Sequence, residues 1–277
     1  MLKIDSHNHF WMYNSIRDSW IDDERALLKR DFLPKDLELE LKDTGQNGCI
    51  VVQSDSSELE NFFQMENASH SHFIKGIIGW VDFQAKNIQE RLDFYGHYPI
   101  IKGFRHILQS ENLRDFMLQK DFLKGISLLE KKGFTYDILI LEDQLGYAQT
   151  FIQKFPYQKF VLDHIGKPDI RHQKLEPWAK AIIKLANYPN VYCKLSGMIT
   201  EAHWQEWKYE HIKPFMDIVL EAFGPKRVLW GSDWPVCLLA GSYKKTFELV
   251  NTYIQKLSPS EQGDIMGANA LDFYSLI

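Results

Sequence analysis

The stretch IDSHNHF at residues 4–10 places two histidines two residues apart, directly after a short apolar and acidic run. The run LKIDSH at 2–7 is typical of a β-strand, in which residues i and i+2 point to the same face. Asp5, His7 and His9 are therefore predicted to share one face, with Ile4 on the other. Two imidazoles aimed at one place can form a site, but an isolated His-X-His pair also fits polar residues at a strand end.

Seven further short apolar runs, rich in β-branched and aromatic residues, follow along the chain. They are CIVVQS at 49–54, IKGIIGWV at 74–81, IIKGFRH at 100–106, FTYDILIL at 134–141, KFVLDHI at 159–165, VYCKLSG at 191–197 and RVLWGSD at 227–233. Helical patterns lie between them, at 34–45, 121–133, 145–155, 177–189 and 212–224, and the tail at 258–277 is typical of a pair of capping helices.

Eight strand-like runs that alternate with helical or polar segments over about 250 residues favour an α/β fold, a single (β/α)8 TIM-type barrel. We expect one domain that spans residues 1–277. The alternative is an open, doubly wound parallel sheet, but no GxGxxG motif follows the first run.

The composition disfavours several classes of partner. Hydrophobic residues make up 45% and charged residues 25% of the 277 residues, as in ordinary globular proteins. The net charge of −5, without a Lys/Arg cluster, argues against nucleic acid. The sequence shows neither a signal-peptide pattern nor an apolar run long enough to span a membrane. The three scattered cysteines, Cys49, Cys193 and Cys237, suggest buried thiols in a reducing compartment. We expect a cytoplasmic protein with a small-molecule partner; the sequence carries no signal for an oligomeric state.

A barrel of this kind places its catalytic side chains at the carboxyl ends of the strands, where the loops meet. Polar residues follow most of the predicted strands. They are His7 and His9 after the first, Gln53 after the second, Trp80 and Asp82 after the third, Arg105 and His106 after the fourth, His164 after the sixth, Ser196 after the seventh and Asp233 after the eighth. Each alone fits a loop residue, but their shared placement predicts an active site.

Four motifs resemble the amidohydrolase superfamily: DSHNHFW at 5–11, GFRHILQ at 103–109, VLDHIGKP at 161–168 and LWGSDWP at 229–235. The resemblance covers essentially the whole chain and points to the amidohydrolase-2 branch and its sugar-lactonase-like group, of L-fuconolactonase or L-rhamnonolactonase type. It implies a (β/α)8 barrel hydrolase that opens lactones of sugar acids or of dicarboxylic aromatic breakdown products. By the same resemblance, the residues around the reacting carbonyl are His7, His9, His164 and Asp233.

The expected metal shell departs from that of the wider superfamily. Metal-dependent members usually add a His after the fifth strand or a modified Lys at the end of the fourth. The fifth run, FTYDILILEDQ at 134–144, contains no His, and Lys102 lies early in its strand, as an ordinary strand lysine would. A Zn²⁺ ion would have His7, His9 and Asp233 as ligands. We therefore expect that no cofactor is required, with a divalent metal such as zinc as the alternative.

Hydrolysis of an ester requires a base, donors for the oxyanion and a proton for the leaving alkoxide. The predicted catalytic roles are Asp233 as base, His7, His9 and Arg105 as donors, and His164 as the group that holds water or protonates the leaving oxygen. The further predicted substrate contacts are Gln53 and His106, for hydroxyl groups, and Trp11, Trp80 and Trp234, for the sugar ring. The strand alternation places Asp163 on the side opposite to His164, so Asp163 is predicted to lie behind the strand in a structural role.

Three hypotheses follow for the function. The first is a sugar-lactone (carboxylic ester) hydrolase that acts by Asp-activated water. The second is a metal-dependent amidohydrolase or non-oxidative decarboxylase of the same superfamily, which the missing fifth-strand His disfavours. The third is a non-catalytic small-ligand binder, which has no need of a base such as Asp233 at its pocket floor. We therefore predict the lactone hydrolase.

Overall fold

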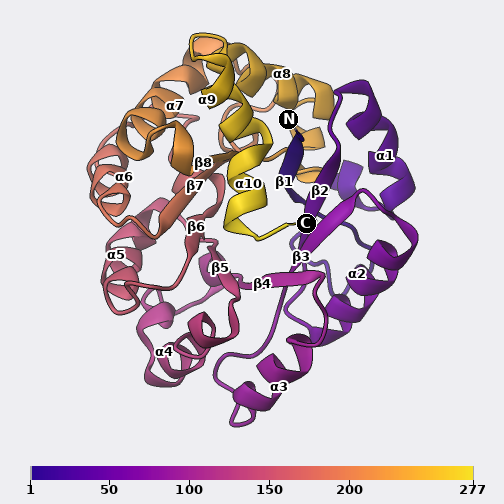
Figure 1. Ribbon diagram of the computed structural model, residues 1–277. Coiled ribbons are helices and arrows are strands. Elements are labelled where there is room, and N and C mark those ends of the chain that lie inside the picture. Colours follow the sequence, from indigo (N-terminus) through magenta and orange to yellow (C-terminus); the bar gives the residue numbers. More distant parts are fainter. Residues whose placement is uncertain (1, 277) are drawn as a thin grey trace.

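The computed structural model describes residues 2–276 and contains an eight-stranded parallel sheet in which the strands follow chain order (Figure 1). The strands are β1 (Ile4–Asn8), β2 (Gly48–Val52), β3 (Ile74–Gly79), β4 (Ile101–His106), β5 (Thr135–Ile138), β6 (Phe160–Leu162), β7 (Val191–Leu195) and β8 (Val228–Trp230). The segment after β8 closes the barrel onto β1, because His9 N donates to Trp234 O at 2.7 Å and Asp233 N donates to His7 O at 2.8 Å. The predicted (β/α)8 barrel is confirmed.

Helices accompany the strands; all but α10 lie around the outer face of the barrel, and α10 crosses one end of it (Figure 1). They are α1 (Pro34–Asp43), α2 (Glu58–His70), α3 (Ile88–Tyr95), α4 (Lys120–Ile126), α5 (Leu145–Gln153), α6 (Trp178–Ala186), α7 (Tyr209–Phe223), α8 (Tyr243–Ile254), α9 (Pro259–Gly263) and α10 (Asn269–Phe273). The predicted helical patterns correspond to α1 and to α4–α7, whereas α2, α3 and α8 were not predicted. Helix α2 buries Asn61 and Gln64 rather than an apolar stripe, which explains why its pattern was missed. Within residues 2–276, no helix has the length and apolar character needed to span a membrane.

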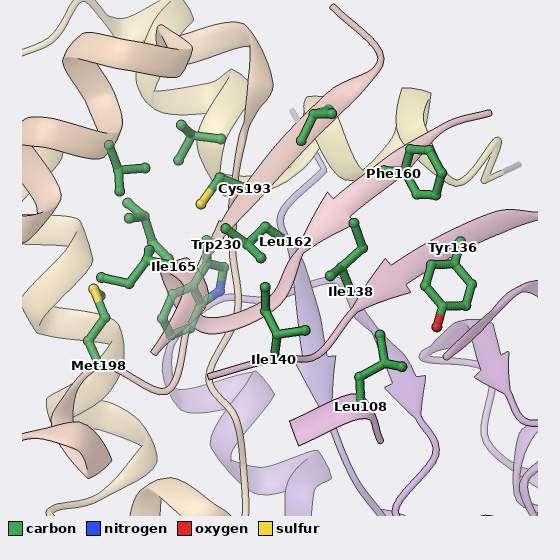
Figure 2. Close-up of a cluster of buried hydrophobic side chains, with 14 of the residues drawn as sticks. Leu108, Tyr136, Ile138, Ile140, Phe160, Leu162, Ile165, Cys193, Met198 and Trp230 are labelled. Carbon is green, nitrogen blue, oxygen red and sulfur yellow. The ribbon is translucent and has the colours of Figure 1, made fainter. Parts of the chain in front are cut away.

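The main core lies between the sheet and the helices. Figure 2 shows part of it, where Tyr136, Ile138 and Leu162 pack with other buried side chains. Tyr136 and Ile138 alternate along β5 with Asp137, so the outward face of this strand is apolar and the residue between faces into the barrel. Burial of each large side chain of this kind stabilises the fold by about 1.5–3 kcal/mol.

A second apolar cluster fills the end of the barrel at which the strands begin. Helix α10 crosses this end (Figure 1), and its Phe273, with the adjacent Tyr274, packs against side chains from inside the barrel. Those side chains are Ile4, Ile50, Val52, Ile78, Val161 and Leu229. Lys102 lies at this same end and donates to Ser275 O at 3.1 Å, far from the carboxyl ends of the strands.

Strand β1 departs from regular alternation. Its register with β2 shifts between Asp5 and Asn8. Ile4 consequently faces the barrel interior, whereas the carboxylate of Asp5 accepts hydrogen bonds from Ser232 N (2.9 Å) and Ser232 Oγ (2.6 Å). Burial raises the pKa of Asp5 to about 6. The prediction that Asp5 shares a face with His7 and His9 is therefore wrong, because a bulge inserts an extra residue into the alternation.

Candidate active site

Three imidazoles surround one carboxylate oxygen at the carboxyl end of the barrel. Oδ1 of Asp233 lies 3.4 Å from Nε2 of His9, 3.8 Å from Nε2 of His7 and 3.9 Å from Nε2 of His164. These groups come from the ends of β1, β6 and β8, and all four residues are buried. The structure therefore brings together the four residues predicted to be catalytic.

Two of these residues have left-handed backbone conformations. His164 has a φ of 52° and Asp233 a φ of 57°, conformations that cost a non-glycine residue about 1–3 kcal/mol. At His164 the left-handed turn breaks the strand alternation, so that Asp163 and His164 both approach His7. Asp163 Oδ1 lies 3.3 Å from His7 Nδ1, and the rings of His164 and His7 are 4.4 Å apart. The prediction that Asp163 lies behind the strand is therefore wrong.

Two glycines leave room for the histidine rings. A Cβ atom on Gly197, which has a φ of +61°, would lie 2.5 Å from Nδ1 of His164. A Cβ atom on Gly231 would lie 2.7 Å from Cβ of His7. Neither distance is compatible with a side chain at these positions. Neither glycine was predicted to shape the site, although Gly231 lies within the LWGSDWP motif.

A buried charge network lies beneath the imidazoles. Lys194 Nζ is 2.5 Å from Asp137 Oδ2, 3.0 Å from Asp163 Oδ1 and 3.1 Å from His7 Nδ1. Lys194 and Asp137 are fully buried, and the hydroxyl of Tyr274 donates to Asp137 Oδ2 at 2.9 Å. Sequence reasoning missed both residues, although a single charge inside each of the apolar runs FTYDILIL and VYCKLSG was a usable signal.

Arg105 is fixed between this network and the cavity. Its Nη1 donates to Asp163 Oδ2 at 3.0 Å, and its Nη2 donates to the carbonyl of Gln53. The side chain of Gln53 in turn donates to Arg105 O at 3.2 Å, so Gln53 supports Arg105 instead of lining the cavity. Among the described residues, the buried Nε of Arg105 has no hydrogen-bond partner, although a buried donor ordinarily has one.

The charges in the site follow from burial and proximity. Burial alone would raise the pKa of Asp233, but His164, His9 and His7 outweigh it and hold that pKa well below its ordinary value. Burial lowers the pKa of His164 to about 4 and places the pKa of His7 well below its ordinary value. At neutral pH the site therefore holds an ionised Asp233 beside neutral His7 and His164 rings.

The backbone fixes which nitrogen of His9 carries the proton. Nδ1 of His9 lies 2.7 Å from the carbonyl oxygen of Val52. Because a carbonyl only accepts hydrogen bonds, Nδ1 is the protonated nitrogen, and Nε2 of the neutral ring presents a lone pair towards Asp233. A neutral His9 is thus an acceptor, which does not fit its predicted role as an oxyanion donor.

A cavity of about 190 Å³ opens above Asp233 and His164. Its polar lining residues are His9, Ser54, Arg105, Gln109, Ser110, His164, Lys167 and Asp233, and its apolar ones are Trp11, Trp20, Ile107, Leu139 and Val236. Trp11 lines the cavity as predicted. The lining residues that were not predicted lie on loops or beyond the strand ends; they are Trp20, Ser54, Ile107, Gln109, Ser110, Leu139, Lys167 and Val236.

Besides Gln53, three residues predicted to contact the substrate do not line this cavity. His106 Nε2 is bound to Glu111 Oε1 at 2.7 Å, and its ring stacks on Phe116. Trp80 lies beside His106, with ring centroids 6.4 Å apart. Trp234 is 2% exposed and packs against aromatic side chains of the core. Since consecutive strand residues face opposite sides, Arg105 points into the barrel and His106 points away from it.

The donor set is compatible with a divalent metal. His7, His164 and Asp233 each offer a ligand atom, and these atoms lie within 4.8 Å of one another. Imidazole nitrogen and carboxylate oxygen are ordinary zinc ligands. This set differs from the predicted ligands His7, His9 and Asp233 by the exchange of His9 for His164.

Comparison with known proteins identifies one matching family model and several similar full-length proteins. The family model for amidohydrolases matches residues 4–276. L-fucono-1,5-lactonase from Burkholderia multivorans is 37% identical over 99% of this chain and 96% of its own length, and the protein of the same name from Burkholderia ambifaria is 31% identical over the same shares. A crystal structure of an amidohydrolase from Burkholderia multivorans with bound zinc superposes with a TM-score of 0.97, at 37% identity over the whole of both chains.

Proposed function

Because this chain belongs to the amidohydrolase family, we propose that its barrel hydrolyses the ring ester of a small sugar-acid lactone. The chain is a lactone hydrolase, as its full-length relatives named L-fucono-1,5-lactonase indicate. The observation that carries the proposal for the site is the placement of Asp233, an ionised carboxylate within 3.4–3.9 Å of three imidazole nitrogens, at the floor of a small cavity.

We assign Asp233 as the general base. A water molecule donates a proton to its carboxylate while the water oxygen attacks the lactone carbonyl, so the C–O bond to water forms as the carbonyl π electrons move onto the oxygen. When the tetrahedral intermediate collapses, the ring C–O bond breaks, and the protonated Asp233 returns the proton to the leaving ring oxygen. A weakly basic carboxylate is sufficient because an ester carbonyl is more electrophilic than an amide.

The remaining roles follow from the donors and acceptors that each side chain presents. Nε of Arg105 has no partner among the described residues, so we assign it to the oxyanion. Nε2 of neutral His9 accepts, so we assign His9 to orienting the water together with Asp233. His164, whose pKa of about 4 leaves it neutral, positions the same water instead of protonating the leaving oxygen.

We propose that the reaction does not depend on a tightly bound metal, because the strand-five run supplies no His ligand. If a divalent metal such as zinc is bound, His7, His164 and Asp233 would hold it, and it would polarise the carbonyl as a Lewis acid. The zinc in the related crystal structure makes this a point to measure.

The cavity favours a sugar lactone with one apolar substituent. Ile107, Leu139 and Val236 contribute apolar side chains to the cavity lining, and Gln109 and Lys167 offer polar groups for hydroxyls. A 6-deoxy sugar places a methyl group where its hydroxylated counterpart has a CH₂OH group. We therefore propose L-fucono-type lactones as preferred substrates. Because the three described cysteines are buried and unpaired, we further propose that the enzyme works in the cytoplasm.

A pH-indicator assay tests the proposed activity. The panel holds L-fuconolactone, L-rhamnonolactone and L-galactonolactone on one side, and dihydropyrimidines and N-acyl amino acids on the other. We expect ring opening of the lactones and little action on the amides, because expelling an amine needs a strong acid or a metal. Cleavage of the amides with the lactones left intact would overturn the proposal and favour a metal-dependent amidohydrolase.

A further inference from the structure

We propose that Asp5 and Ser232 are positioning residues that hold the left-handed turn at Asp233, and with it the direction in which the base points. Neither side chain takes part in the reaction steps assigned to the site. Both are fully buried and neither lines the cavity, so any effect on catalysis has to pass through another group. The inference rests on the proposed function only for its kinetic consequence, because the conformation of the turn can be measured without a substrate.

Three consecutive backbone N–H groups, those of residues 232 to 234, are each held by an acceptor. Ser232 N donates to Oδ1 of Asp5 at 2.9 Å. Asp233 N donates to the carbonyl of His7 at 2.8 Å. Trp234 N donates to Oγ of Ser232 at 3.0 Å. The peptide groups on both sides of Asp233 are therefore fixed, and two of the three acceptors are side-chain atoms.

The hydroxyl of Ser232 connects this turn to the carboxylate of Asp5. Oγ of Ser232 lies 2.6 Å from Oδ2 of Asp5 and 3.3 Å from the carbonyl oxygen of His7. A hydroxyl has a single proton, and the shorter contact with the carboxylate takes it, which leaves a lone pair of Oγ for Trp234 N. Oδ1 of Asp5 also accepts from His7 N at 3.1 Å. One carboxylate of β1 thus ties this strand to the N–H groups on both sides of Asp233.

The turn needs such anchors because its conformation is unfavourable for a residue with a side chain. Asp233 has a φ of 57°, and a left-handed backbone persists at a non-glycine residue only where its surroundings over-determine it. Relaxation to an extended conformation would redirect the Cα–Cβ bond of Asp233. Its Oδ1 would then leave its place 3.4 Å from Nε2 of His9. The hydrogen bonds of Asp5 and Ser232 therefore maintain the position of the base.

The kinetic test compares Ser232→Ala with Ser6→Ala as a matched control. The Ser6 hydroxyl is also fully buried and also donates at 2.6 Å, but its acceptor is the carbonyl of Trp230 in β8 and not the turn. We expect Ser232→Ala to lower kcat by about 10²-fold, as a misplacement of about 1 Å does, with KM changed much less. Ser6→Ala should keep kcat near the wild-type value.

A double-mutant cycle separates positioning of the base from a general loosening of the barrel. If Ser232 acts through Asp233, its replacement costs little in an enzyme that already carries Asp233→Asn, because the base is absent. We expect the residual lactone turnover of the combined variant to lie within about twofold of that of Asp233→Asn alone. A further loss as large as in the wild-type background would show a purely structural role and refute the inference.

Replacement of Asp5 tests whether hydrogen bonds, and not charge, hold the turn. In Asp5→Asn the amide oxygen can still accept from Ser232 N, and the amide nitrogen can donate to Oγ of Ser232, whose own proton then goes to the carbonyl of His7. We expect Asp5→Asn to retain most of kcat and Asp5→Leu to lose it. If Asp5→Leu does not fold, Ser232→Ala still tests the turn. A loss in Asp5→Asn as deep as in Ser232→Ala would contradict the hydrogen-bond account.

Crystal structures of the wild type and of Ser232→Ala provide a measurement that needs no substrate. We expect a left-handed φ at Asp233 in the wild type, and in the variant a displacement of Oδ1 by about 1 Å. An unmoved Asp233 in the folded variant, or an equal loss of kcat in Ser6→Ala, would overturn the inference. A wild-type enzyme that opens no lactone would refute the proposed function alone, because the crystallographic comparison would still stand.

Discussion

Nε2 of His9 and Oδ1 of Asp233 lie 3.4 Å apart, and both atoms accept hydrogen bonds when His9 is neutral. The carbonyl of Val52 enforces this arrangement by binding the other ring nitrogen of His9. Two acceptors so close together attract a hydrogen-bond donor or a cation. A water molecule drawn in by its hydrogens keeps an oxygen lone pair free for a carbonyl carbon, which is the orientation that hydrolysis requires.

Replacement of Asp233 by asparagine should preserve the fold and remove most activity. Asparagine has nearly the same shape but cannot take a proton, so kcat should fall by about 10²- to 10⁴-fold. Lactone turnover and thermal unfolding of purified Asp233→Asn check this. Asp82→Asn serves as the control, because Asp82 is an exposed residue after β3. Turnover near the wild-type rate in Asp233→Asn would rule out Asp233 as the general base.

The acid limb of the pH profile of kcat/KM should lie at an unusually low pH. Burial depresses the pKa of His164 to about 4, and the imidazoles depress that of Asp233, so both groups keep their active forms as the pH falls from 7 to 5. Below about pH 4, protonation of His164 puts a positive charge beside Asp233, and kcat/KM should drop. Initial rates in buffers of constant ionic strength measure this. A limb near 6.5, the ordinary pKa of histidine, would contradict the assigned protonation states.

Gly197→Ala should displace the ring of His164. The added Cβ would lie 2.5 Å from Nδ1 of that ring, and the residue has a φ of +61°. A misplacement of about 1 Å can cost about 10²-fold, so we expect kcat/KM to fall by that order. The control is Gly146→Ala on α5, where a Cβ meets nothing within 4 Å. Equal activity of the two variants would show that His164 does not need its observed position.

Leu139→Ser should reduce the preference for 6-deoxy lactones. Leu139 is one of the apolar residues that line the cavity and is 4% exposed. A single methyl contact in such a pocket is worth about 10- to 200-fold in discrimination. The quantity to measure is the ratio of kcat/KM for L-fuconolactone to that for L-galactonolactone. Leu141→Ser, outside this cavity, should leave the ratio unchanged. An unchanged ratio in Leu139→Ser would show that Leu139 does not contribute to the preference for 6-deoxy lactones.

Chelation should leave activity largely intact. We expect purified enzyme to hold less than one divalent metal per chain and to hydrolyse lactones after dialysis against a chelator. Elemental analysis and paired rate measurements check both points. One tight zinc per chain, with activity lost on removal and restored on return, would contradict this and make His7 and His164 metal ligands.

The sequence predicted the barrel and the four central residues because apolar runs and the polar residues at their ends are local signals. It failed where the backbone departs from regular alternation. The bulge in β1 turns Asp5 outward, and the left-handed turn at His164 brings that side chain inward beside Asp163, which the alternation with Val161 already places inside. It also failed for Lys194, because pairing across the barrel is not visible in one strand. For His106, the alternation itself would have placed the side chain outside once Arg105 was placed inside.

The proposed catalytic groups are divided between the two halves of the barrel. The first half, β1–β4, supplies His7, His9 and Arg105, and the turns after β6 and β8 in the second half supply His164 and Asp233. Two fragments split in the loops between β4 and β5 would each lack part of the constellation, so neither would hydrolyse a lactone alone. Recovered turnover on mixing them would report reassembly of the complete barrel, which makes this chain suitable as a split-enzyme reporter.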